Sequence, residues 1–200
     1  MTRRTSAAKK AKTFPSADQV RQATFDMIAA RGYGKTRLSD LADQFGVSFK
    51  EFHAHYASVD DIIRAFLDDV DQSMVASVHP GSAANKREIY FDMMMARMDA
   101  LQEHRAGVVR WLKEIVKQPQ LWGGVLKRWQ KSLSLMLDIA KDSPVYPVKK
   151  LGLAGVYATT LRTWVDDDSA DMAKTMASLD KALSKAESVA EKLFKRPKRP

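Results

Sequence analysis

Apolar residues recur at a helical spacing through nearly the whole chain, and no segment alternates apolar and polar residues as a half-buried strand does. This periodicity predicts an all-α fold, because apolar helix faces must be buried against other helices. Caps and chain breakers set the ends of about nine predicted helices. These helices span residues 16–31, 37–45, 48–55, 58–78, 85–104, 107–117, 121–141, 148–165 and 169–194.

The first 60 residues have the pattern of a helix-turn-helix. Ser16 and Ser58 each stand three residues before a side chain that can complete a capping box, and Thr36 and Ser48 are predicted caps. Gly46 provides the turn between the second and third helices. In this motif the first helix braces the second, whose N-terminal residues meet base edges in the major groove. The spacing therefore predicts a DNA-binding domain over residues 16–60.

Composition favours a soluble globular protein of the cytoplasm. Of the 200 residues, 45% are hydrophobic and the mean hydropathy is -0.35, which suits one substantial core or two small ones. Charged residues interrupt every apolar run and no apolar segment follows the basic N-terminus, so neither a membrane span nor a signal peptide is expected. The absence of cysteine excludes disulfides and thiolate metal sites.

The net charge of +9 resides at the two ends of the chain. Residues 1–12 carry five cations and the last six residues carry four, with no acid in either segment, whereas residues 14–60 carry one more acid than cations. Two interpretations stay open: disordered arms that lie along DNA phosphates, or solubilising tails. If the chain binds DNA, the arm of residues 1–15 is expected to supply much of the attraction to phosphate, and residues 195–200 form a second basic tail.

Four short motifs within residues 16–64 closely resemble the N-terminal signature of the tetracycline-repressor (TetR) family. They are Arg31-Gly32-Tyr33, Thr36-Arg37-Leu38-Ser39-Asp40-Leu41-Ala42, Gly46-Val47-Ser48 and Phe52-His53-Ala54-His55-Tyr56. The resemblance implies a homodimeric transcriptional regulator, a repressor, whose operator binding is controlled by a small apolar ligand. His53 and Val59 stand where the family usually has a tyrosine and a lysine.

The same resemblance implies which residues contact double-stranded DNA. The helix that begins at Ser48 would bind the operator, and residues near the start of the preceding helix would lie beside the DNA backbone. The expected contact residues are Lys35, Thr36, Arg37, Ser39, Ser48, Phe49, Lys50, His53, His55 and Tyr56.

The two C-terminal helices are predicted to form a dimer interface. Apolar residues of 169–194 alternate spacings of four and three, as in a heptad seam, and 148–165 has small residues that permit close helix approach. Two such helices from each subunit would make an intermolecular four-helix bundle, and packing within one chain is the alternative. The predicted interface comprises Leu151, Ala154, Ala158, Leu161, Met172, Met176, Leu179, Leu183 and Ala186.

Residues 61–194, the predicted ligand-binding and dimerisation domain, hold all four tryptophans and most of the methionines. Large apolar side chains at helical spacing ordinarily form a core. Indoles and adaptable thioethers also line apolar cavities, so a pocket for a small apolar ligand is the second interpretation. Its expected lining is Met94, Met98, Trp111, Trp122, Leu126, Trp129, Tyr157 and Trp164.

A stretch near the C-terminus resembles another group of proteins with the repressor fold. Trp164-Val165-Asp166-Asp167-Asp168-Ser169, followed by Thr175 and Leu179-Asp180-Lys181, is similar to the end of the ubiquinone-biosynthesis lipid-binding proteins. The resemblance implies an alternative function, a lipid- or isoprenoid-binding accessory protein of quinone biosynthesis. That family is expected to carry an amphipathic membrane helix after its last bundle helix, whereas residues 195–200 here are too polar and too few.

No motif for catalysis, a cofactor or a metal ion is found in the sequence. His53 and His55 lie two positions apart on a predicted helix and so point to different sides. The acidic run 166–168 has two interpretations, a cation site or a cap for the following helix, and capping is favoured. A solvated or core role is favoured for His104. The chain is therefore not expected to be an enzyme.

Overall fold

The computed structural model describes residues 14–78, 85–142 and 147–194. Within these ranges the chain is helical and contains no strand, which confirms the predicted fold class. Two short 3₁₀ turns, Tyr33–Lys35 and Pro119–Leu121, were not predicted. The α-helices are α1 (Ala17–Arg31), α2 (Leu38–Phe45), α3 (Phe49–His55), α4 (Val59–Ala76), α5 (Lys86–Gln102), α6 (Arg105–Ile115), α7 (Trp122–Ile139), α8 (Pro147–Val165) and α9 (Ala173–Phe194).

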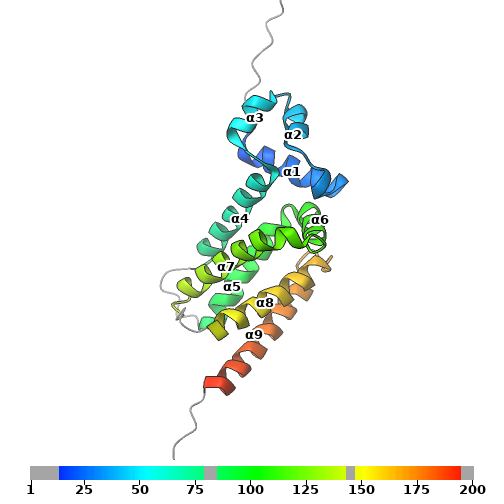
Figure 1. The fold of residues 1–200 in the computed structure, drawn as a ribbon. Coiled ribbons are helices and arrows are strands. Elements are labelled where there is room, and N and C mark those ends of the chain that lie inside the picture. Colours follow the sequence, from blue (N-terminus) through cyan, green and yellow to red (C-terminus); the bar gives the residue numbers. More distant parts are fainter. Residues whose placement is uncertain (1–13, 79–84, 143–146, 195–200) are drawn as a thin grey trace, which may run out of the picture.

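The helices form a small N-terminal unit and a larger bundle, and α4 runs from one to the other (Figure 1). A small hydrophobic core lies among α1 to α4 and is centred on Leu41 and Phe52. A larger core fills the bundle and includes Met94 and Trp164. Helix α1 contributes to both cores, since Val20 packs in the small one and Phe25 in the large one.

Helix starts follow the local sequence signals in most cases. Ser16, Ser48 and Ser58 each accept a hydrogen bond from a backbone N–H three residues on, as predicted. Thr36 was predicted to cap α2, and this was wrong. Arg37 is the residue before the helix, and the buried hydroxyl of Thr36 donates instead to the carbonyl oxygen of Gly32 at 2.9 Å. The side chain of Thr36 therefore stabilises the 3₁₀ turn before α2.

A buried ion cluster fixes the C-terminal half of α4 in the bundle. Asp71 of α4 accepts hydrogen bonds from Arg97 of α5 and Arg128 of α7. The hydroxyl of Ser132 donates to the same carboxylate at 3.1 Å. The side chains of Asp71 and Arg97 are each only 5% exposed. Loss of one partner would leave a buried charge uncompensated, so the cluster holds α4 against α5 and α7.

One residue of the acidic run before α9, Asp167, caps that helix, the interpretation favoured from the sequence. Asp167 is buried and accepts hydrogen bonds from the backbone N–H of Thr175 at 2.8 Å and from its hydroxyl at 2.7 Å. Burial alone would raise the pKa of Asp167, but its hydrogen bonds with Ser169 and Thr175 hold the pKa well below the usual value. No helix in the described ranges combines the length and apolar character that a membrane crossing requires.

Candidate DNA-binding surface and ligand cleft

Helix α3 lies at the opposite end of the molecule from the C-terminal half of α9 (Figure 1). Phe52 anchors it, because this side chain is fully buried and its ring contacts the rings of Phe14, Phe45 and Tyr56. With one face of α3 held in this way, the other face is open to solvent. The geometry suits a helix that enters the major groove of DNA.

The open face of α3 combines aromatic and cationic side chains. Phe49 is 52% exposed, and its ring stacks on the ring of His53 with centroids 5.5 Å apart. Lys50 is also exposed. Apolar rings can contact thymine methyl groups, while lysine and histidine N–H groups can donate to base acceptors or phosphate oxygens. The surface therefore carries groups suited to contacts with bases and to contacts with phosphates.

Most of the predicted DNA-contact residues are accessible. Ser39 and Tyr56 are partly buried, and Thr36 is buried by the interaction described above. The exposed members are Lys35, Arg37, Ser48, Phe49, Lys50, His53 and His55. The contact set as a whole stays a prediction.

Only some of the cations in this unit are free to meet an external anion. Arg21 pairs with Asp69, and Arg31 pairs with Asp40 at 2.9 Å. Lys35, Arg37 and Lys50 form no ion pair within the part of the chain that the structure describes. The basic arm and the basic tail lie outside the described residues.

Helix α6 connects the small N-terminal unit to the bundle. His104, just before α6, is buried and stacks on Phe25 of α1 with ring centroids 5.2 Å apart. Burial lowers the pKa of His104, and neither ring nitrogen has a hydrogen-bond partner among the described residues. At the other end of α6, Glu114 accepts a hydrogen bond from the N–H of Gly34 at 3.3 Å. His104 is thus a core side chain, one of the two roles expected for it.

The residues predicted to line an apolar pocket are scattered over different environments. Met94, Met98 and Trp164 are fully buried in the large core, where they pack against other side chains. Trp122 and Leu126 are 50% and 49% exposed on α7. The remaining members are Trp111 and Tyr157, which are buried, and Trp129, which is partly buried. A pocket with this lining stays a prediction.

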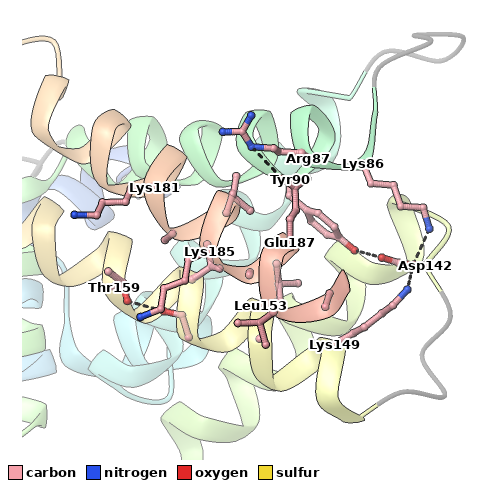
Figure 2. Close-up of a pocket in the computed structure, with 18 of the residues that line it drawn as sticks. Lys86, Arg87, Tyr90, Asp142, Lys149, Leu153, Thr159, Lys181, Lys185 and Glu187 are labelled. Carbon is pink, nitrogen blue, oxygen red and sulfur yellow. Dashed lines mark hydrogen bonds and ion pairs between the residues drawn. The ribbon is translucent and has the colours of Figure 1, made fainter. Parts of the chain in front are cut away.

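A cleft of about 820 Å³ lies between α8 and α9, with α5 at one end (Figure 2). None of the residues predicted for the apolar pocket lines it. Small and apolar side chains, among them Leu153 and Ala186, form its walls together with Gly152 and Gly155. Its size falls within the usual range for small-molecule sites. The cleft was not predicted from the sequence, although two of its lining residues, Leu183 and Ala186, were assigned to the dimer interface.

At one end of the cleft lies a carboxylate, Asp142, whose oxygens are already engaged by neighbouring side chains. Asp142 pairs with Lys86 at 2.6 Å and with Lys149 at 2.7 Å, and the hydroxyl of Tyr90 donates to it at 3.0 Å (Figure 2). Burial alone would raise the pKa of Asp142, but these hydrogen bonds lower it to about 2. Burial and the bond to Asp142 raise the pKa of Tyr90. The carboxylate is therefore ionised and fully engaged at neutral pH.

The predicted dimer residues divide into three groups by their exposure. Met172, Leu179 and Leu183 are buried in the core of the same chain, so packing within one chain accounts for this part of the heptad seam. Leu151 is 74% exposed on α8, and Ala158 is also exposed. The partly buried members are Ala154, Leu161, Met176 and Ala186. Dimerisation stays a prediction, and the most accessible of the proposed residues are Leu151 and Ala158 on α8.

A helix-turn-helix unit joined by a long α4 to a helical bundle is the architecture of TetR transcriptional regulators, and this chain has that fold. A TetR transcriptional regulator from Nitrosomonas europaea superimposes with a TM-score of 0.74 at 19% identity, over 86% of this chain and 98% of that one. One from Rhodococcus sp. RHA1 gives a TM-score of 0.58 at 13% identity, over 85% and 95% of the two chains. These likenesses confirm the fold expected from the N-terminal motifs.

Two matches in sequence accompany the likeness in fold. The chain is 33% identical over 101 residues to the HTH-type transcriptional repressor KstR2 of Mycobacterium tuberculosis. This match covers 47% of the chain and 50% of the relative, so the chain spans about half the length of the curated relatives it matches. The COQ9 family model matches residues 132–190. Both resemblances expected from the sequence, one at the N-terminus and one near the C-terminus, are thereby confirmed.

Proposed function

We propose that this chain is a DNA-binding transcriptional regulator, a repressor, that acts as a homodimer under the control of a small ligand. The observation that carries the proposal is the open face of α3, where Phe49, Lys50 and His53 are exposed on a helix anchored by Phe52. The similarity to the repressor KstR2 supports it.

The route from a ligand to the DNA-binding unit runs through α4 and α6. Asp71 ties α4 to α5 and α7, while His104 and Glu114 connect α6 to α1 and to the turn before α2. A shift of α5 or α7 on ligand binding would move α4 and with it the recognition helix. In a dimer the two recognition helices must match half-sites about 34 Å apart, so a small shift lowers the affinity for DNA.

The test is fluorescence anisotropy with duplexes from the region upstream of the chain's own gene and with random duplexes. Lys50→Ala and His53→Ala are expected to reduce discrimination between the two by about 1–3 kcal/mol per lost base contact. Lys174→Ala, at an exposed lysine of α9, is the matched control and should leave binding unchanged. Equal affinity of the parent chain for both duplexes at every salt concentration would refute the proposal.

A second candidate function is that of a lipid- or isoprenoid-binding accessory protein of quinone biosynthesis. The COQ9 match favours it, because residues 132–190 include α8 and most of α9, the helices that form the cleft. A vesicle assay separates the two functions. Transfer of acyl or isoprenoid lipid between vesicles, together with no preference for any DNA sequence, would establish the accessory protein in place of the regulator.

A further inference from the structure

We propose that the cleft between α8 and α9 binds a single-chain anionic amphiphile. Its carboxylate or phosphate head group pairs with Lys181 and Lys185, and its alkyl chain lies along the apolar wall that includes Leu153. Figure 2 shows the two lysines at one end of the cleft and the Asp142 cluster at the other, with Leu153 between them. The proposal names the class of ligand that would control DNA binding, and to that extent it rests on the function proposed above.

Lys181 and Lys185 are the cations that an incoming anion can neutralise. Both line the cleft, both are exposed, and neither has an acidic partner within the described residues. They stand four residues apart on α9, where like charges repel each other across one helix turn. An anionic head group between them relieves that repulsion and gains charge-assisted hydrogen bonds.

The opposite end of the cleft does not compete for the head group. Lys86 and Lys149 are already bound to Asp142 there. Arg87, another cation of the lining, contacts the stretch of α9 that carries the two lysines, but it is engaged by Asp180 at 2.5 Å and by Glu187 at 3.6 Å. Because the cations at the Asp142 end are already paired, one head group is expected at the end that holds Lys181 and Lys185. From Lys181 to Ala190, the lining of α9 extends about 13 Å at the helical rise per residue, which suits a medium-length alkyl chain.

The wall of α8 leaves room for that chain. A Cβ atom added to Gly152 or Gly155 would meet no atom within 4 Å. Each glycine within a helix costs about 0.5–1 kcal/mol relative to alanine, and neither residue has a backbone conformation that requires glycine. Both residues line the cleft, so their absent side chains enlarge it.

A second copy of the chain is the other occupant to consider, and charge disfavours it. In a two-fold interface centred on the cleft, Lys181 and Lys185 of one copy would meet the same two lysines of the other if the axis runs along the cleft, or its Asp142 cluster if the axis runs across it. That cluster holds two lysines against one carboxylate, so either arrangement buries more ammonium groups than acids, which is unfavourable. The exposed α8 residues of the predicted dimer interface, Leu151 and Ala158, do not line the cleft. A small anion fits this arrangement better.

The experiment is isothermal titration calorimetry of the full chain with decanoate, decyl phosphate and 1-decanol, each below its micelle or solubility limit. At least one anion is expected to bind one site per chain, at least about tenfold tighter than decanol. The tighter of the two anions identifies a carboxylate or a phosphate head group. Decanol binding as tightly as both anions would overturn the proposal.

Two pairs of variants locate the site. The double variant Lys181→Gln and Lys185→Gln should lower anion affinity at least about tenfold and leave decanol unchanged. Its matched control is Lys174→Gln with Lys192→Gln, at exposed lysines of α9 outside the cleft lining. Gly155→Leu should weaken all three probes, whereas Gly124→Leu, at an exposed glycine of α7 with open space around it, should not. Unchanged anion binding in the Lys181 and Lys185 double variant, or in Gly155→Leu, would overturn the proposal.

Light scattering and DNA anisotropy on the same samples separate the remaining outcomes. If the parent chain binds no anion and Gly155→Leu converts a dimer to a folded monomer, a second copy covers the cleft and the proposal fails. Anion binding by a chain without DNA preference would refute only the regulator function. DNA preference without anion binding would refute only the ligand site.

Discussion

A methyl group on Gly107 would lie 2.3 Å from the carbonyl oxygen of Phe25. The obstacle is backbone of α1, which cannot rotate away as a side-chain tip could. Helix α6 therefore approaches α1 as closely as a residue without a side chain allows, at the junction between the N-terminal unit and the bundle.

We expect Gly107→Ala to lower the free energy of unfolding by about 1–3 kcal/mol, because the helices must separate to relieve the overlap. Urea unfolding followed by circular dichroism measures this. Gly124→Ala on α7 is the control, since open space surrounds its Cβ position and alanine is the better helix former, so it should stabilise by about 0.5–1 kcal/mol. Equal effects of the two substitutions would contradict the close approach.

Removing the carboxylate of Asp71 is expected to be far more damaging than removing that of Asp68. Asp71→Ala leaves Arg97 buried without its partner and should lower the free energy of unfolding by about 3–5 kcal/mol. Asp68→Ala breaks ion pairs of a half-exposed side chain with Arg128 and Lys131, and should cost less than about 1 kcal/mol. Similar costs for the two variants would mean that the cluster does not anchor α4.

The Asp142 cluster predicts a dependence of stability on pH. The pKa of Asp142 is lowered from 3.8 to about 2 in the folded chain, so its ionised form stabilises the fold above pH 3.8, and this contribution is lost as pH falls towards 2. Asp142→Asn should therefore lower the free energy of unfolding by about 2 kcal/mol at pH 6 and have little effect near pH 2. Chemical unfolding at both pH values checks this. An effect that does not change with pH would show that the charge of Asp142 is not involved.

Leu151→Arg is expected to convert a dimer into a folded monomer, because this leucine is 74% exposed in the single chain and contributes little to its core. Leu183→Arg would instead disrupt the core, which makes it a poor probe of assembly. Light scattering gives the mass, and Val116→Arg, at another exposed apolar residue, is the control. A dimer that withstands Leu151→Arg would exclude the outer face of α8 as the interface.

Deletion of residues 2–12 should weaken binding to every duplex. The five cations of the arm would each release counterions on contact with phosphate, so the slope of log K against log salt should fall by about 0.9 per lost contact. Anisotropy at several salt concentrations measures the slope. A slope that does not change would identify the arm as a solubilising tail.

The fold could be predicted from the sequence largely because its signals are local. Ser16, Ser48 and Ser58 mark helix starts through hydrogen bonds to residues three positions away, and Gly46 adopts the left-handed conformation in the turn before α3. The exception, Thr36, shows the limit of such signals. Its hydroxyl can either accept a hydrogen bond from a backbone N–H of α2, as a cap does, or donate to the carbonyl oxygen of Gly32, and only the three-dimensional path of the turn decides between the two.

The partners of apolar faces and the position of the cleft could not be predicted in this way. Periodicity shows that Leu179 and Leu183 lie on one face of α9, but not that this face packs within the same chain. Likewise, large side chains such as Trp164 are fully buried in the core. A cleft arises where side chains are small, as at Gly152 and Gly155. A search of the sequence for large apolar residues does not find such positions.

The double packing of α1 bears on how proteins of this architecture can be recombined. Phe25 and Ile28 belong to the large core, while Val20 and Ala23 on the same helix belong to the small one. A fragment that ends after α3 would expose Phe25 and Ile28 to water, because the large core that buries them would be missing. A chimera that transplants the N-terminal unit onto another bundle must therefore also bring a surface shaped like α6, with a glycine opposite Phe25, so the segment to be exchanged is larger than the helix-turn-helix.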